Sequence, residues 1–249
     1  MEERFFKFSN LSTFSELVHG ISNRNFGDMR FGHQKESEVV KNRELFLSQL
    51  NINLSDIVVP SLVHSVKIAN VGQDDKGKGS IDPKTAIMAT DGLITKEKGV
   101  YLMVTVADCL PVLIYDPILK IVSVLHAGWR GIIGQIIPHA IDKLRNLGIA
   151  PQNLIIGVGP GICQKHFVVK RDVLSLFLDY YPSATLVRNN DGYVDLKKTV
   201  LIDLKNMGVA ENNIEITDVC TVCSNGIYGS YRKEKESVPA AAVVMGVKE

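Results

Sequence analysis

The sequence predicts an α/β protein, because stretches with helical spacing alternate with short apolar runs that are typical of β-strands. Three segments follow one pattern, in which an amphipathic helix ends, a Gly or Asn follows, and a polar turn leads into a β-rich run. Gly or Asn after a helix supplies a left-handed C-cap, and helix-to-strand units of this kind build α/β folds. The segments are residues 45–64, 143–159 and 203–220. We interpret their likeness as shared α/β architecture rather than a true repeat.

Three further runs are expected to be strands covered on both faces, because they are rich in β-branched residues and almost continuously apolar. They read GVYLMVTVA, PVLIYD and KIVSVLHA. Helical spacing predicts helices in residues 131–148, 168–182 and 196–208. Pro138 either starts the regular part of the first of these helices or kinks it. The glycine-containing segment 71–85 is expected to be a surface loop.

Composition narrows the classes of function. The chain has 249 residues, 45% of them hydrophobic, and a formal net charge of +1, so we expect a folded protein whose partners do not include nucleic acid bound by bulk electrostatics. No stretch reaches the roughly 18 apolar residues of a membrane span, and the N-terminal residues lack an apolar run of signal-peptide length. Four scattered cysteines do not form a disulfide framework. These features favour a cytoplasmic protein that does not bind a membrane.

The last two apolar runs predict an antiparallel hairpin joined by residues 116–119, with Tyr115 facing Lys120. In that register Cys109 lies opposite His126. Side chains directly across such a pair have Cβ atoms about 4.5–5.5 Å apart. The hairpin therefore places a thiol beside an imidazole, provided that the register is correct.

Cysteine and histidine side chains are good zinc ligands, but a site needs at least a third ligand. Among six histidines, His64 ends a strand-like run that a helix-to-strand unit delivers, whereas His139 lies in a predicted helix. His64, Cys109 and His126 would form a two-His, one-Cys site with an open fourth position, as in catalytic zinc sites. Core packing of Cys109 remains an alternative, since buried cysteines are often small hydrophobes.

The remaining cysteines carry weaker signals. Cys220 and Cys223 form a CxxC, but no second CxxC or HxxxH completes a zinc knuckle and no thioredoxin pattern surrounds it. The segment GVGPGIC, which ends at Cys163, lacks the spacing of a phosphate-binding loop, so a tight turn after a strand is expected. The sequence favours no metal or redox role for these cysteines and leaves their function open.

The stretch VADCLPVLIYDP followed by VLHAGWRG resembles the signature of the laccase-domain family, also called multicopper polyphenol oxidases and purine nucleoside phosphorylases. The resemblance runs the length of the chain. Supporting matches are HGISNRNFG, VVKNRELF, LVHSVKIANV, TDGLIT, GPGICQKHFVV and CTVCSNGIYGSYR. The sequence departs from the family pattern beside the first histidine, where Leu62 and Ser65 replace the usual Gln and Gly.

This resemblance implies one domain over residues 1–249, with mixed β-sheets sandwiched between helices in an α/β/β/α arrangement. It implies zinc held by His64, Cys109 and His126. It also implies phosphorolysis of adenosine, inosine, guanosine and methylthioadenosine, with adenosine deamination as a second activity, in a monomer or homodimer. Cys109 and Arg43 are the expected catalytic residues.

Phosphorolysis requires a site for the phosphate anion. Arg43 carries over from the family as an active-site arginine, and together with Arg24 or Arg130 it could hold phosphate through paired hydrogen bonds. These three arginines are therefore the expected substrate-binding residues, although a salt bridge within the fold is the alternative role for each.

Three other classes of function compete with this interpretation. A copper oxidase is the first, because two His and one Cys can hold copper, although six histidines without a His-x-His pair are too few for a multicopper cluster. A metal-free hydrolase is the second, with Cys109 as nucleophile and His126 as base. A non-catalytic binding module is the third.

Overall fold

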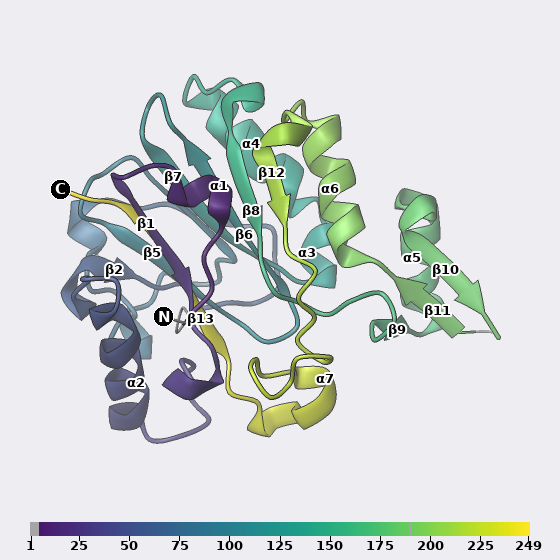
Figure 1. Cartoon of the computed structure of the whole chain (residues 1–249), viewed down its shortest axis with the longest axis horizontal. Coiled ribbons are helices and arrows are strands. Elements are labelled where there is room, and N and C mark those ends of the chain that lie inside the picture. Colours follow the sequence, from purple (N-terminus) through teal and green to yellow (C-terminus); the bar gives the residue numbers. More distant parts are fainter. Residues whose placement is uncertain (1–4, 190) are drawn as a thin grey trace.

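Two β-sheets face each other at the centre of the protein, in the computed structural model that describes residues 5–189 and 191–249 (Figure 1). The first sheet has four strands in the order β1-β13-β5-β2. Only β2 and β5 run parallel, and the other neighbours are antiparallel. Its strands are β1 (Leu17–Ile21), β13 (Ala241–Val247), β5 (Tyr101–Val106) and β2 (Ile57–Val58).

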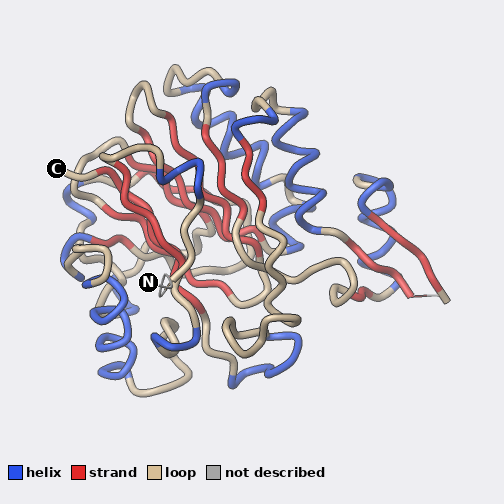
Figure 2. Tube along the Cα trace, in the orientation of Figure 1, coloured by secondary structure: helices blue, strands red, loops and turns tan. Residues whose placement is uncertain are grey.

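The second sheet has six strands in the order β12-β8-β6-β7-β4-β3, and Figure 2 shows it beside the first sheet. It is mixed, because the two outermost pairs are parallel and the inner pairs are antiparallel. Its strands are β12 (Ile214–Ile216), β8 (Ile155–Val158), β6 (Leu110–Asp116), β7 (Ile121–Ala127), β4 (Gly92–Thr95) and β3 (Ile68–Asn70).

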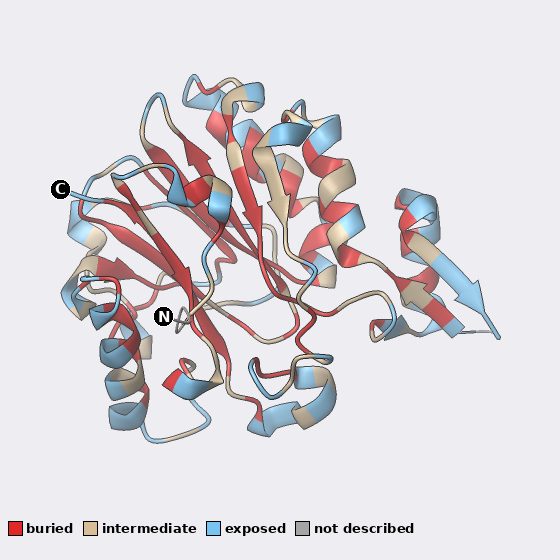
Figure 3. Cartoon of the chain, viewed as in Figure 1, coloured by how far each residue is buried: buried red, intermediate tan, exposed pale blue. Residues whose placement is uncertain are grey.

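Alternating side chains of the strands fill two different cores. In β6, Leu113 and Tyr115 point into the core between the sheets, whereas Val112 and Ile114 pack against helices on the opposite face. The outer face of the four-stranded sheet packs against α2 (Glu36–Ser48) through Phe46. Figure 3 shows the central strands of the two large sheets as buried, whereas the edge strand β12 is partly exposed. The predicted order of layers, α/β/β/α, is confirmed.

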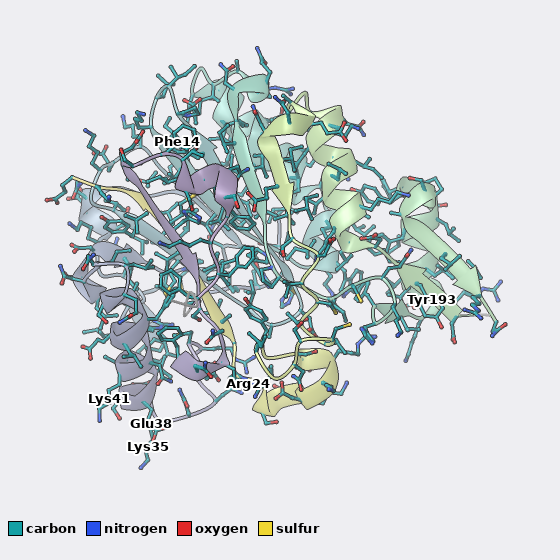
Figure 4. The ribbon with its side chains drawn as sticks, viewed as in Figure 1. Phe14, Arg24, Lys35, Glu38, Lys41 and Tyr193 are labelled. Atoms are coloured by element: carbon teal, nitrogen blue, oxygen red, sulfur yellow. The ribbon has the colours of Figure 1, made fainter. Side chains whose placement is uncertain are left out.

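Helices α3 (Trp129–Ile133), α4 (Ile136–Asn146) and α6 (Leu196–Asn206) cover the free face of the six-stranded sheet. A small third sheet projects at one side together with α5 (Arg171–Tyr180), and Figure 4 labels Tyr193 on it. Its strands are β10 (Thr185–Arg188), β11 (Asp191–Val194) and β9 (Val168–Val169). The remaining helices are α1 (Ser9–Ser12) and α7 (Tyr231–Glu234). Within the described residues, none of the helices is both long and apolar enough to cross a membrane.

The C-terminal ends of α2, α4 and α6 follow the sequence prediction, whereas the helix predicted over residues 168–182 is shorter, because residues 168–169 form β9 and α5 begins at Arg171. Asn51, Gly148 and Gly208 all have positive φ angles, of 56°, 87° and 85°, as expected for left-handed residues that terminate helices. The helix predicted over residues 131–148 is divided into α3 and α4, because Gln135 takes a left-handed conformation with φ of 71°. Pro138 lies in the first turn of α4, where proline is compatible with a helix.

The central hairpin has a different register from the predicted one. Tyr115 pairs with Val122, and Pro111, not Cys109, pairs with His126. The turn lies one residue later than predicted, because β6 continues to Asp116 and β7 begins at Ile121. The Asp116 side chain accepts a hydrogen bond from the backbone N–H of Leu119 at 2.7 Å and caps this turn. The shift is even, so each side chain keeps its predicted face.

Candidate metal centre and pocket

The three predicted ligands meet at one end of the hairpin. The ligand atoms of His64, Cys109 and His126 all lie within 4.8 Å of one another, and the two imidazole rings are nearly perpendicular, with centroids 4.8 Å apart. Sulfur and imidazole nitrogen are donors that zinc and copper both accept. The chain thus brings together a donor set suited to a metal ion, with three protein ligands.

A buried carboxylate orients this cluster. Asp91 Oδ1 lies 2.9 Å from His126 Nδ1, which leaves His126 Nε2 available as the ligand atom. Carboxylates that hold the second nitrogen of a histidine ligand fix its tautomer and raise its basicity. The sequence analysis did not identify Asp91, although the stretch TDGLIT that contains it was one of the matches to the family.

The same carboxylate shapes the loop that carries His64. Asp91 accepts hydrogen bonds from the backbone N–H groups of Val63, His64 and Ser65, at 2.6–3.2 Å. His64 itself has φ of 59°. The prediction that His64 ends a strand is therefore wrong: β2 stops at Val58, and the loop satisfies its N–H groups with a carboxylate instead of a neighbouring strand.

Gly128 lets the loop approach the hairpin. A Cβ atom at this position would lie 3.0 Å from both Cys109 Sγ and His64 Cδ2, which is closer than most Cβ contacts. Any side chain here would push the ligands apart. The glycine in HAGWRG therefore has a steric role in assembling the cluster.

Cys109 and His126 each stabilise the charged form of the other. Burial alone would raise the pKa of the Cys109 thiol, but the adjacent His126 and His64 outweigh burial and lower it to about 6. Burial alone would lower the pKa of His126, but Cys109 and Asp91 raise it to about 10. The neighbouring histidines therefore favour the thiolate of Cys109, and the thiolate is the form that binds metal.

The cluster lies in the wall of a pocket of about 570 Å³, a volume typical of sites for small molecules. Apolar and cationic side chains share this wall. The apolar group includes Leu62, Val106, Trp129, Ile162, Phe167, Leu196 and Tyr231. The cationic group consists of Arg30, Arg130, Arg232 and Lys235.

The three predicted arginines lie in different places. Arg130 lines the pocket, with its guanidinium 4.3 Å from the centre of the Trp129 ring. Arg24 is not among the lining residues; it forms an ion pair with Glu234 at 2.7 Å, and Figure 4 labels it beside α7. Of Arg24 and Arg130, only Arg130 is therefore positioned to contact an anion bound in the pocket.

Arg43 lies away from the pocket, on α2, and its side chain is 2% exposed. Its guanidinium donates hydrogen bonds to the carbonyl oxygens of Met29, Gly79 and Ser80, at 2.7–3.0 Å. Burial lowers its pKa to about 10. Through these hydrogen bonds Arg43 connects α2 to two loops of the fold. Its side chain does not contact His64, Cys109 or His126.

Asp108 and Arg232 are pocket residues that the sequence analysis did not assign. Asp108 lies before β6 with φ of 79° and lines the pocket. Its carboxylate accepts hydrogen bonds from the Thr221 hydroxyl at 2.5 Å and from the Arg232 backbone N–H at 2.6 Å. Asp108 thereby fixes the C-terminal segment that delivers Arg232 and Lys235.

Known proteins resemble this chain over most of its length. A family model described as multi-copper polyphenol oxidoreductase laccase matches residues 12–247. The purine nucleoside phosphorylase YlmD of Bacillus subtilis (strain 168) is 31% identical over 247 residues, which cover 96% of this chain and 89% of that protein. The adenosine deaminase RL5 from an unknown prokaryotic organism is 29% identical over 190 residues, which cover 74% of this chain and 72% of that protein.

Solved structures extend the likeness to the fold. The crystal structure of YlmD from Geobacillus stearothermophilus superposes with a TM-score of 0.94 and 25% sequence identity, covering 100% of this chain and 98% of that chain. The crystal structure of the Bacillus licheniformis hypothetical protein YfiH gives a TM-score of 0.90 with 26% identity, covering 93% of each chain.

Proposed function

The chain belongs to the multi-copper polyphenol oxidoreductase laccase family, and we propose that it is a zinc-dependent purine nucleoside phosphorylase. Its substrates would be phosphate and the nucleosides adenosine, inosine, guanosine and methylthioadenosine. The observation that carries the proposal is the position of the three-ligand cluster His64, Cys109 and His126 in the wall of a pocket that also contains four cationic side chains. The name of the Bacillus subtilis relative supports the same reaction.

The cationic side chains account for the use of phosphate. Phosphorolysis joins phosphate to ribose C1′ while the bond from C1′ to the purine nitrogen breaks, so the enzyme must hold an anion beside the sugar. Arg130, Arg232 and Lys235 are the groups we assign to this task, because guanidinium groups bind phosphate through paired charge-assisted hydrogen bonds. Trp129, Phe167 and Tyr231 offer aromatic faces for the purine.

The metal ligands have a separate task. Bound zinc supplies Lewis-acid stabilisation of developing negative charge. Three protein ligands are typical of catalytic zinc, whereas structural zinc takes four. Asp91 holds His126 in the tautomer that exposes Nε2, and it also fixes the backbone of His64, so the donors are arranged before a metal binds.

Adenosine deamination is a second proposed activity of the same pocket. The relative named adenosine deaminase RL5 is the observation that favours it. Deamination needs water and no phosphate, so the two activities are separated by leaving phosphate out of the assay.

The test is incubation of the purified protein with adenosine, with and without phosphate, followed by measurement of adenine, inosine and ribose 1-phosphate. We expect adenine and ribose 1-phosphate only when phosphate is present, and inosine under both conditions. His64→Ala should remove all products. The matched control is His139→Ala, which changes an exposed histidine of α4 and should leave all products in place.

Several outcomes would contradict the proposal. Products that persist in His64→Ala would disprove the site. Stoichiometric copper with an intense blue absorbance would favour the oxidase, although the six histidines of the chain are few for a multicopper cluster. Activity that survives metal removal but not thiol modification would favour a cysteine hydrolase with Cys109 as nucleophile. If the protein turns over no nucleoside when phosphate is supplied, the remaining interpretation is a non-catalytic binding module.

A further inference from the structure

A second group of cysteine and histidine side chains that could hold a metal lies outside the set of residues that line the pocket. Cys163, His166, Cys220 and Cys223 have ligand atoms that all lie within 4.8 Å of one another. Two sequence pairs contribute to it, a C-x-x-H and a C-x-x-C, which are separated by more than fifty residues. We call these four residues the closed cluster, and we call His64, Cys109 and His126 the open cluster.

The distances within the closed cluster match those of tetrahedral zinc. His166 Nδ1 lies 3.3 Å from Cys163 Sγ, 3.7 Å from Cys220 Sγ and 3.6 Å from Cys223 Sγ. With Zn–S bonds of about 2.3 Å and Zn–N bonds of about 2.0–2.1 Å, ligands at tetrahedral angles have S···N separations of about 3.6 Å. One ion could therefore bond to all four atoms with little movement of the chain.

The backbone of both pairs is folded into tight turns that aim the side chains inward. The Cys163 carbonyl accepts hydrogen bonds from the N–H groups of His166 and Phe167, at 3.0 and 2.9 Å, and the Cys220 carbonyl accepts one from Ser224 at 2.8 Å. The chains that leave β8 and β12 run side by side here (Figure 1), and Gly161 and Cys220 form a parallel bridge. The turns are therefore held together by the fold itself.

The electrostatics of the closed cluster favour a cation. The backbone N–H of Cys163 donates a hydrogen bond to Cys220 Sγ at 3.3 Å, so this sulfur already accepts from a positive dipole. Three sulfur atoms this close cannot all be thiolates without a positive ion between them, and a divalent metal removes that repulsion.

We propose that Cys163, His166, Cys220 and Cys223 form a second zinc site, structural in character and distinct from the open cluster. Four protein ligands of the Cys₃His type leave no position for a substrate, which is the pattern of structural zinc. This proposal does not depend on the proposed nucleoside chemistry.

The site would stabilise one wall of the pocket. Ile162 and Phe167, which flank the C-x-x-H pair, line the pocket. The backbone carbonyl of His166 also accepts a hydrogen bond from Arg232 Nη1 at 2.7 Å. Zinc at the closed cluster would therefore connect the turn beside β8 to the C-terminal segment and keep Arg232 in place.

The experiment is a metal count on untagged protein, purified without chelator from cells grown with added zinc. Mass spectrometry of the metals should find two zinc ions per wild-type chain. The double variant Cys163→Ser/Cys223→Ser should hold one fewer, and His64→Ala/Cys109→Ser should also hold one fewer. His139→Ala, a change of an exposed histidine, should match the wild type.

The proposal is overturned if Cys163→Ser/Cys223→Ser retains as much zinc as the wild type, or if the wild-type protein contains a Cys163–Cys220 disulfide. Failure of the proposed function would give a different pattern of metal counts. If the open cluster binds no zinc, the wild type holds one ion and Cys163→Ser/Cys223→Ser holds none, which supports the closed site.

A second measurement covers the case in which the serine variant does not fold. His64→Ala/Cys109→Ser leaves the closed cluster intact, so this variant can be loaded with cobalt in place of zinc. We expect strong thiolate-to-cobalt charge-transfer absorption and the intense visible bands of tetrahedral cobalt. Weak octahedral-type bands without charge transfer would overturn the proposal.

Discussion

The two clusters use the same two residue types and differ in ligand number and surroundings. The open cluster has three ligands and lies in the wall of a cationic pocket, and a buried carboxylate, Asp91, holds its histidines. The closed cluster has four potential ligands, none of which is among the residues that line the pocket, and a backbone N–H, that of Cys163, donates to Cys220 Sγ. Ligand number decides whether a metal can meet a substrate, so one molecule contains a site suited to catalysis and one suited to holding the chain together.

The largest expected contrast is between two cysteine substitutions. Cys109→Ser should lower turnover more than about 10³-fold, because a catalytic metal supplies several kcal/mol and each 1.36 kcal/mol is tenfold in rate. Cys223→Ser should retain turnover within about tenfold, since a structural metal does not take part in the reaction. Steady-state phosphorolysis of inosine measures both. Equal losses would remove the functional distinction between the clusters.

A change beside each cluster sharpens the comparison. Asp91→Asn should weaken metal binding or activity about 10–100-fold, because the carboxylate partner of a histidine ligand contributes that much. The same change at Asp218, an exposed acid two residues before Cys220, should have little effect. Competition with a zinc chelator, together with turnover, measures the difference. An unaffected Asp91→Asn variant would show that the carboxylate has no role in holding the metal.

Arg130 tests the pocket beside the open cluster. Arg130→Ala should raise the KM for phosphate about tenfold, since charge-assisted hydrogen bonds contribute about 1.5–3 kcal/mol. The matched control is Arg188→Ala, an exposed arginine on β10, for which the KM should not change. Initial rates at varied phosphate concentration provide the measurement. The assignment fails if kcat falls while the KM for phosphate stays constant.

The smallest effect on turnover, and the clearest on stability, is expected from the closed cluster. Cys163→Ser should lower Tm by about 10 °C, because a ligand at a thousand times its Kd contributes about 4 kcal/mol and each kcal/mol shifts Tm by about 2–4 °C in chains of this size. Calorimetry of the zinc-loaded proteins measures the shift. If Cys109→Ser lowers Tm as much, the structural role does not belong to the closed cluster alone.

The layered fold was largely predictable from the sequence, because the hydrophobic pattern and the helix ends are local. Gly148 and Gly208 end helices through their own positive φ angles. This signal is local and does not depend on how the rest of the chain packs. The hairpin was predicted with the wrong register. That register depends on how the Asp116 side chain caps the turn, and an apolar pattern of period two does not distinguish registers two residues apart.

The proximity of His64, Cys109 and His126 was predicted correctly, but the carboxylate that hydrogen-bonds to this cluster was not identified. Asp91 acts through hydrogen bonds to a loop and a strand that are far from it in sequence. Arg43 illustrates the opposite case. Its sequence context resembles a family motif, but burial against three carbonyl oxygens gives it contacts in the fold, away from the pocket.

The sequence by itself determined the α/β architecture, the family, and the residue types that make up the open cluster. Only the tertiary structure decided which distant residues meet. The C-x-x-C of Cys220 and Cys223 has no second pair near it in sequence, and the fold supplies one by laying the turn of Cys163 and His166 beside it. Ligand sets depend on distances of a few ångströms in space, and those distances are set by strand pairing and packing rather than by spacing along the chain.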